Sequence, residues 1–112
     1  MKEKKSYAFD IDGVICNSKN GDYENSQPIL EAIDKINDLY EKGNTIIIFT
    51  ARFMGRSKND VKKAHELGYE FTLAQLRRWN VKFDKLYFGK PSFDILIDDK
   101  AFNYSNKWIT EI

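Results

Sequence analysis

The sequence predicts an α/β fold with a mainly parallel sheet, carried by a single domain over residues 1–112. Short apolar runs of strand length alternate along the chain with two longer stretches in which apolar residues recur at helical spacing. Polar side chains able to do chemistry follow directly after the apolar runs. Alternating strands and helices are typical of parallel strands joined by right-handed crossovers, and the length is sufficient for one such domain.

The expected elements are joined by short connections. In chain order they are a strand over 7–11, a loop over 13–27 in which 14–16 suit one half of a small flap hairpin, a helix that starts at 26–28 and ends at 43–44, a strand over 45–49, a helix over 59–79, a weaker strand centred on 86–88, a turn over 89–92 and a strand over 93–97. Trp108 and Ile109 suit a short edge strand or a packed tail.

Local sequence signals support these assignments. Ser26 and Pro28 favour a helix start, because a capping side chain and a proline in the first turn both suit one. Apolar side chains then recur at helical spacing, at Ile29, Ile33, Ile36 and Tyr40. The β-branched run over 45–49 predicts a strand buried on both faces, and Gly68 marks a point where the second helix can break.

The short connection over 89–92 leaves the course of the third strand open. A parallel crossover normally needs a dozen or more residues, and this connection is much shorter. The third strand is therefore vestigial, antiparallel, or joined to the fourth by an extended crossover.

The composition excludes several classes of protein. Lys and Arg together number 18 and Asp and Glu 17, and the resulting net charge of +1 gives no overall attraction to nucleic acid or to a membrane. The single cysteine, Cys16, excludes an internal disulfide framework and fits a reducing compartment. The sequence shows neither a signal-peptide pattern nor an apolar stretch of membrane-spanning length, so we expect a cytoplasmic protein with no membrane partner.

Polar side chains stand where each predicted strand ends. They are Asp10 and Asp12 after the first strand, Thr50 and Arg52 after the second, Lys90 after the third, and Asp98 and Asp99 after the fourth. Ligands of open α/β sheets bind outside the carboxyl ends of the strands, where the strand order reverses. For the two acidic pairs to meet there, the fourth strand must neighbour the first, which predicts the order 4-1-2-3 in a three-layer, Rossmann-like sandwich.

A cluster of carboxylates at one edge of the sheet predicts a bound cation. Two like charges about 4 Å apart repel by roughly 4 kcal/mol at an effective dielectric constant of 20. The candidate ligands are hard oxygens with no Cys or His beside them, which favours Mg²⁺ over Zn²⁺. Acidic groups, Mg²⁺ and flanking cations together suit a phosphoryl group.

The same motifs resemble those of the haloacid dehalogenase superfamily of phosphatases. Phe9-Asp10-Ile11-Asp12-Gly13 is similar to its first motif, Thr50 to its second, Lys90 to its third and Ile97-Asp98-Asp99 to its fourth. The closest resemblance is to small capless members associated with capsular or surface polysaccharide biosynthesis. No connection is long enough for a cap domain, and the helix that members usually carry between the lysine motif and the last strand has no room here.

The resemblance implies a role for each of these residues. Asp10 would be the nucleophile that forms an aspartyl-phosphate, and Asp12 the general acid and base. Asp10, the backbone carbonyl of Asp12, and Asp98 would hold Mg²⁺, with Asp99 as a further ligand or a partner of the ligands. Thr50 and Lys90 would hold the phosphoryl oxygens. To these we add Arg52, because a guanidinium can bind a phosphate with two parallel hydrogen bonds.

The predicted function is therefore Mg²⁺-dependent phosphomonoester hydrolysis of a phosphorylated sugar or polysaccharide precursor, a small-molecule substrate. One alternative is a polynucleotide end phosphatase, since the Thr-Ala-Arg and Ile-Asp-Asp pieces also resemble such domains, although the balanced charge disfavours nucleic acid. Another is a phospho-accepting or binding module without hydrolysis. An uncapped site and the aromatic content also leave room for a homodimer.

Overall fold

A three-stranded parallel sheet forms the centre of the protein. The structure is a computed structural model that describes residues 3–102, 105 and 107–112. Strands β1 (Ser6–Phe9), β4 (Thr45–Thr50) and β5 (Lys85–Phe88) lie in the order β1-β4-β5, and both pairs are parallel. The α/β class and the parallel sheet are confirmed, and the third predicted strand runs parallel to the second.

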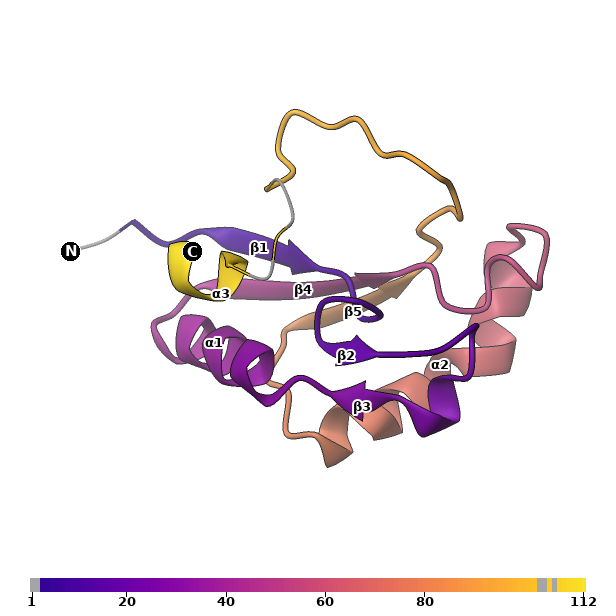
Figure 1. The fold of residues 1–112 in the computed structure, drawn as a ribbon, viewed down its shortest axis with the longest axis horizontal. Helices are drawn as coiled ribbons and strands as arrows, with labels where there is room; N and C mark the ends of the chain where they lie inside the picture. Colours follow the sequence, from indigo (N-terminus) through magenta and orange to yellow (C-terminus); the bar gives the residue numbers. More distant parts are fainter. Residues whose placement is uncertain (1–2, 103–104, 106) are drawn as a thin grey trace.

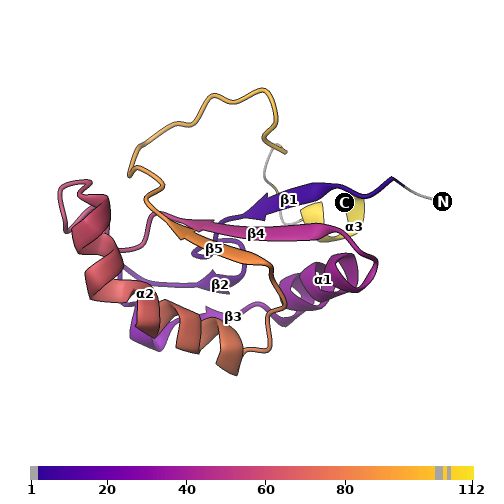
Figure 2. The same ribbon diagram turned by 180° about the vertical axis from the view of Figure 1, so that it is seen from behind.

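Two long helices cover one face of this sheet. Helices α1 (Leu30–Glu41) and α2 (Val61–Arg78) lie on the same side of the strands in both views (Figures 1 and 2). Their apolar stripes pack against the alternate strand residues that point toward them, which include Phe9, Ile46, Ile48, Leu86 and Phe88. Helix α2 continues through Gly68 without the break that the sequence allowed.

The opposite face of the sheet is left open in the described part of the chain. Phe49 is 38% exposed and its register partner Tyr87 46% exposed, and Ile47, two residues before Phe49 on the same face, is half-buried. The prediction that the second strand is buried on both faces is therefore wrong, because both long helices pack on one side. The second helical layer of a three-layer sandwich is not present among the described residues.

A small flap follows β1. Strand β2 (Cys16–Asn17) pairs antiparallel with β3 (Gln27–Pro28), and the 3-10 helix η1 (Tyr23–Asn25) lies in the loop between them. The flap hairpin expected from residues 14–16 is thus present, shifted toward the C-terminus. The helix start predicted at Ser26 is wrong, since α1 begins after Ile29 and Ser26 is buried beside Ser18, with which it forms a hydrogen bond.

The chain after β5 forms no strand in the described residues. Residues 91–102 are exposed and irregular, and they arch away from the sheet on the side opposite the helices (Figures 1 and 2). The strand predicted over 93–97 is absent from the described sheet, and the connection after β5 is too short for a helical crossover back to β1. The described sheet thus contains the first, second and third predicted strands in that order, as β1-β4-β5, without the predicted fourth strand beside β1.

The C-terminal residues end as a short helix rather than an edge strand. Helix α3 (Trp108–Glu111) places the Trp108 ring 5.4 Å from the ring of Phe9, and the Trp108 side chain is buried. The expectation of a packed tail holds at this position. No helix in the described residues is long and apolar enough to span a membrane.

Candidate active site at the carboxyl ends of the strands

Polar side chains from all three strand ends meet beside one cavity. The cavity has a volume of about 310 Å³ and is lined by Asp10, Asp12, Ser18, Gly21, Tyr23, Ala51, Arg52, Gly55 and Ser92. These residues come from the end of β1, the flap loop, the end of β4 and the segment after β5. The structure therefore brings together the first acidic pair with the residues predicted after the second and third strands.

Asp10 is paired with the lysine that follows β5. Its Oδ2 lies 3.3 Å from Nζ of Lys90, and its Oδ1 accepts a hydrogen bond from the backbone N–H of Ile11 at 2.8 Å. Gly89 gives the turn that aims the lysine, since its φ of +102° suits glycine. The backbone N–H of Lys90 then donates to the carbonyl of Thr50 at 3.2 Å. This contact joins residues that are far apart in the sequence.

Asp12 is paired with a buried arginine. Nε of Arg52 donates to Oδ2 of Asp12 at 2.9 Å and Nη2 donates to Oδ1 at 3.0 Å, which is the bidentate geometry of a guanidinium and a carboxylate. The Arg52 side chain is 0% exposed and that of Asp12 28% exposed. The two parallel hydrogen bonds that we predicted from Arg52 to a phosphate are made here to Asp12.

The other donors of Arg52 are also matched with acceptors. Nη1 donates to Oε1 of Gln75 at 2.6 Å and to Oγ1 of Thr72 at 3.5 Å, both on α2. Nη2 also lies 3.6 Å from Sγ of Cys16. Since a guanidinium has five N–H donors, the whole group is held by the protein in this structure.

Thr50 ends β4 on its buried side. Its Oγ1 accepts a hydrogen bond from the backbone N–H of Arg52 at 3.0 Å, and the residue is fully buried. The hydroxyl thereby shapes the turn that directs Arg52 inward. Thr50 itself does not line the cavity.

The turn after β1 is organised around one carbonyl. The Ile11 oxygen accepts hydrogen bonds from the N–H groups of Val14, Ile15 and Cys16 at 3.1, 2.8 and 3.2 Å. Gly13 makes this turn with a φ of +88° and donates its own N–H to the Cys16 carbonyl at 2.8 Å. The sequence Asp-Ile-Asp-Gly thus places both carboxylates at the cavity while the chain reverses into the flap.

Cys16 lies beneath the site as a buried thiol. Burial raises the pKa of Cys16 above its ordinary value, and the nearby Ser18 hydroxyl partly offsets this effect. A thiol with a raised pKa is a weak nucleophile at neutral pH. Cys16 therefore serves as packing and as a weak hydrogen-bond partner of Asp12 and Arg52.

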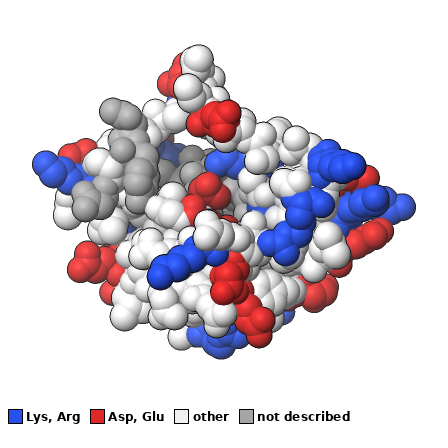
Figure 3. Space-filling view, turned by 45° about the vertical axis from the view of Figure 1, so that its right-hand side comes forward, with Lys and Arg blue, Asp and Glu red and all other residues white. Residues whose placement is uncertain are grey.

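Aromatic and basic side chains stand at the rim of the cavity. The Tyr23 ring lies between two guanidinium groups, with Cζ of Arg52 at 4.6 Å and Cζ of Arg56 at 5.3 Å from its centroid. Arg56 also donates to the carbonyl of Gly21 at 2.9 Å. Figure 3 shows acidic and basic side chains interspersed over the face it presents, rather than a patch of one sign.

The second acidic pair is not part of this cluster. Asp98 and Asp99 lie in the exposed segment after β5, where Oδ1 of Asp98 accepts from the backbone N–H of Lys100. Among the described residues, no three His, Cys, Asp or Glu side chains come close enough to hold a metal ion. Oxygen ligands suit Mg²⁺ by chemistry, but their present arrangement does not fit one.

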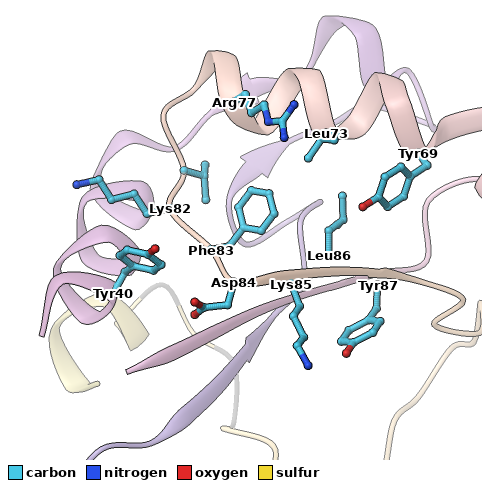
Figure 4. Close-up of a pocket in the computed structure, with 11 residues that line it drawn as sticks. Tyr40, Tyr69, Leu73, Arg77, Lys82, Phe83, Asp84, Lys85, Leu86 and Tyr87 are labelled. Carbon is cyan, nitrogen blue, oxygen red and sulfur yellow. The ribbon is translucent and has the colours of Figure 1, made fainter. Parts of the chain in front are cut away.

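A larger cavity lies at the other end of β5, and its lining includes none of the residues Asp10, Asp12, Arg52 and Lys90. It has a volume of about 610 Å³ and is lined by residues of α2, the following loop and β5, among them Tyr69, Phe83 and Tyr87 (Figure 4). Its carboxylate, Asp84, accepts a hydrogen bond from the backbone N–H of Ile46 at 2.8 Å and so serves the sheet. We therefore place the candidate site at the carboxyl ends of the strands.

Sequence reasoning missed several residues of the site. Ser18, Tyr23 and Ser92 line the cavity from loops, where residue type alone carries little signal. Gln75 was missed too, although it left a trace in the sequence. Gln75 and Thr72 are polar residues on the buried stripe of α2, and a polar interruption of an apolar stripe indicates a buried hydrogen-bond partner.

The comparisons with known proteins support the fold. No protein-family model matches this chain, and no curated protein matches it significantly. The chain is similar to a crystal structure of a protein from Vibrio cholerae described as an MCSG target, with 26% sequence identity, a TM-score of 0.81, and coverage of 96% of this chain and 94% of that chain. That description names no activity, so the likeness extends over nearly the whole chain but carries no function.

Proposed function

We propose that this chain is a capless phosphomonoester hydrolase of the haloacid dehalogenase type that works through an aspartyl-phosphate. One observation carries the proposal. Asp10 and Asp12 line the same cavity at the end of β1, and a lysine from the end of β5 lies 3.3 Å from Asp10. A nucleophile, a second carboxylate and a cation beside one cavity are what phosphoryl transfer requires.

The chemistry assigns different roles to the two carboxylates. Asp10 would attack phosphorus, so that a bond forms between its carboxylate oxygen and phosphorus while the ester bond breaks and its electron pair leaves with the substrate oxygen. Asp12 would give that oxygen a proton and later accept one from the water that hydrolyses the aspartyl-phosphate. Lys90 would balance the negative charge of the phosphoryl oxygens.

We also propose the strand order 4-1-2-3, with a fourth strand beside β1. β1 has a free edge in the described sheet, and Ile95 and Ile97 are 80% and 94% exposed. An open edge and an exposed apolar segment both favour strand addition. We infer that the C-terminal part of the predicted strand 93–97, from about Ile95 on, adds to β1 as a parallel fourth strand, which would bring Asp98 and Asp99 to Asp10.

An extended crossover can bring only the C-terminal part of residues 93–97, from about Ile95 on, to that position. The start of such a strand lies about 14 Å sideways from β5 and about 13 Å back along it, or about 19 Å on the diagonal. The chain from Phe88 to Phe93 spans at most about 18 Å when extended, which falls short of that diagonal, whereas the chain from Phe88 to Ile95 spans up to about 25 Å. The connection would cross the open face of the sheet and cover Phe49 and Tyr87, so it would supply the missing third layer.

Mg²⁺ enters the proposal only with this docked segment. Asp10, the Asp12 carbonyl, Asp98 and Asp99 would then be its ligands, and the ion when bound would neutralise charge on the phosphoryl oxygens. The cavity of about 310 Å³ suits a small phosphorylated sugar or polysaccharide precursor. The net charge of +1 gives no overall attraction for a polynucleotide end.

The test is phosphate release by the purified protein from 4-nitrophenyl phosphate and a panel of sugar phosphates, with and without Mg²⁺. We expect Mg²⁺-dependent turnover by the wild type, and a loss of at least about 10³-fold in kcat for Asp10→Asn, since an amide cannot act as the nucleophile. Equal release by both proteins would disprove the role of Asp10. A phosphorylated Asp10 that persists for hours would instead indicate a phospho-accepting module.

A further inference from the structure

A buried polar pair lies beneath the flap and is not used in the proposed chemistry. Arg52 and Gln75 are each 1% exposed, and they come from the end of β4 and the last turn of α2. Burying a charge and an amide is costly unless each is fully hydrogen-bonded. An apolar pair would fill the same space at less cost, so the polar pair calls for a functional reason.

Gln75 joins the flap to Arg52 through both ends of its amide. Its Oε1 accepts from Nη1 of Arg52 at 2.6 Å, and its Nε2 donates to the backbone carbonyl of Tyr23 at 2.8 Å. Tyr23 is the first residue of η1, in the middle of the flap loop. The backbone of the loop is thus fixed to α2 through one side chain.

The flap also contacts Asp12 directly. The Ser18 hydroxyl donates to Oδ1 of Asp12 at 2.6 Å, and the Tyr23 ring lies against the guanidinium of Arg52 at 4.6 Å. The start and the middle of the loop therefore touch the ion pair formed by Arg52 and Asp12. The loop cannot move as a body without disturbing the acceptors and donors that orient the Asp12 carboxylate.

We propose that Arg52 and Gln75 are positioning residues that couple the closure of the flap loop, residues 18–25, to the orientation of Asp12. The role of Asp12 as general acid and base rests on the proposed function. The coupling between the loop and Asp12 rests only on the hydrogen bonds and ring contact described above. Ser18, Gly21 and Tyr23 line the cavity. A leaving group of the substrate that binds under the loop would therefore change the contacts that orient Asp12, the carboxylate that protonates it.

The first test measures the coupling without any activity. Gln75→Met keeps the length of the side chain and removes both hydrogen bonds of the amide. We expect backbone amides in peptides spanning 18–26 to exchange hydrogen at least about tenfold faster, the effect of losing one or two hydrogen bonds that hold the loop. Peptides of α1 and β4 should be unchanged. Unchanged exchange in the flap would overturn the proposal.

A matched control and a second variant keep this test sharp. Thr72→Val is buried on the same helix and removes only the 3.5 Å contact with Nη1 of Arg52, so flap exchange should stay within about twofold of wild type. If Gln75→Met does not fold, Gln75→Glu retains an acceptor for Arg52 and loses the donor to Tyr23. Faster flap exchange is expected there as well, and its absence would equally refute the coupling.

The second test separates positioning from a general structural defect. A 4-nitrophenolate leaving group needs no proton, whereas a sugar alkoxide does. We expect Gln75→Met and Arg52→Lys to lower kcat for a hexose phosphate at least about tenfold more than for 4-nitrophenyl phosphate. Equal losses of kcat for both substrates would show that Arg52 and Gln75 stabilise the fold without positioning Asp12. If the wild type hydrolyses neither ester, the proposed function fails, and the exchange experiment still decides the coupling.

Discussion

Asp10 and Asp12 are separated by one residue but have different surroundings. Asp12 is bonded at both oxygens to a guanidinium whose side chain is 0% exposed, whereas the partner of Asp10 is a lysine side chain that is 18% exposed. Water can replace the carboxylate as a partner of Lys90 more easily than as a partner of Arg52. The two aspartates should therefore differ in what they contribute to stability.

Substitution of each carboxylate tests this difference. Asp12→Asn leaves a buried guanidinium without a charged partner, and we expect it to lower the free energy of unfolding by about 2–3 kcal/mol. Asp10→Asn breaks a partly exposed pair and should change it by no more than about 1 kcal/mol. Urea unfolding of both variants beside the wild type measures this. The reverse ranking would show that Arg52 does not depend on Asp12.

At the scale of elements, the loop after β4 is fitted to helix α2 at one glycine. Phe53 has a φ of +66°, which is uncommon for a bulky residue, and it turns its ring onto Gly68 in the middle of α2. A Cβ at position 68 would lie 2.2 Å from Cδ2 of that ring. Gly68 is therefore required by packing, although it weakens the helix.

Gly68→Ala should reveal this conflict. Alanine gains about 1 kcal/mol of helix propensity, but the clash with the ring costs about 1–3 kcal/mol, so we expect a net loss of about 1 kcal/mol and a lower Tm. In a Phe53→Ala background the clash is gone, and the same substitution should raise Tm. Thermal unfolding of the four proteins measures both signs, and a stabilising effect in the wild-type background would contradict the contact.

The sequence predicted the elements whose signals are local. The β-branched run that forms β4 and the apolar run before Asp10 both end where the structure ends them, to within two residues, because strand length and turn residues are written in neighbouring positions. The pairing of Arg52 with Asp12 was missed, since nothing local distinguishes a protein carboxylate from a phosphate as its acceptor. The start of α1 was missed because Ser26 has a tertiary partner, Ser18, which replaces the capping role.

At the scale of the whole molecule, an open sheet face and an exposed apolar segment lie on the same side. Phe49 and Tyr87 are exposed on that face, and Phe93, Ile95 and Ile97 are exposed in the segment that arches beyond it (Figure 1). Contiguous exposed apolar surface indicates that something covers it. The proposed docking of residues 93–97 covers it within one chain, and a second copy of the chain is the alternative cover.

Docking of this segment should depend on Mg²⁺. Asp98 and Asp99 would otherwise bring two more negative charges to Asp10, and repulsion of roughly 4 kcal/mol per close pair opposes that approach without a cation. We therefore expect added Mg²⁺ to slow hydrogen exchange of the amides of residues 93–99 in the wild type. In Asp98→Asn, the Mg²⁺ concentration needed for half of this protection should be at least about tenfold higher than in the wild type, since one charged ligand is lost.

Asp94→Asn is the matched control, because it removes a carboxylate from the same exposed segment without removing a proposed ligand. Its Mg²⁺-dependent protection should equal that of the wild type. Protection that is absent in all three proteins would rule out the docked fourth strand, and protection that Asp94→Asn loses as fully as Asp98→Asn would reduce the effect to general screening of charge. Protection that grows with protein concentration would assign the cover to a second copy, because docking within one chain is independent of concentration.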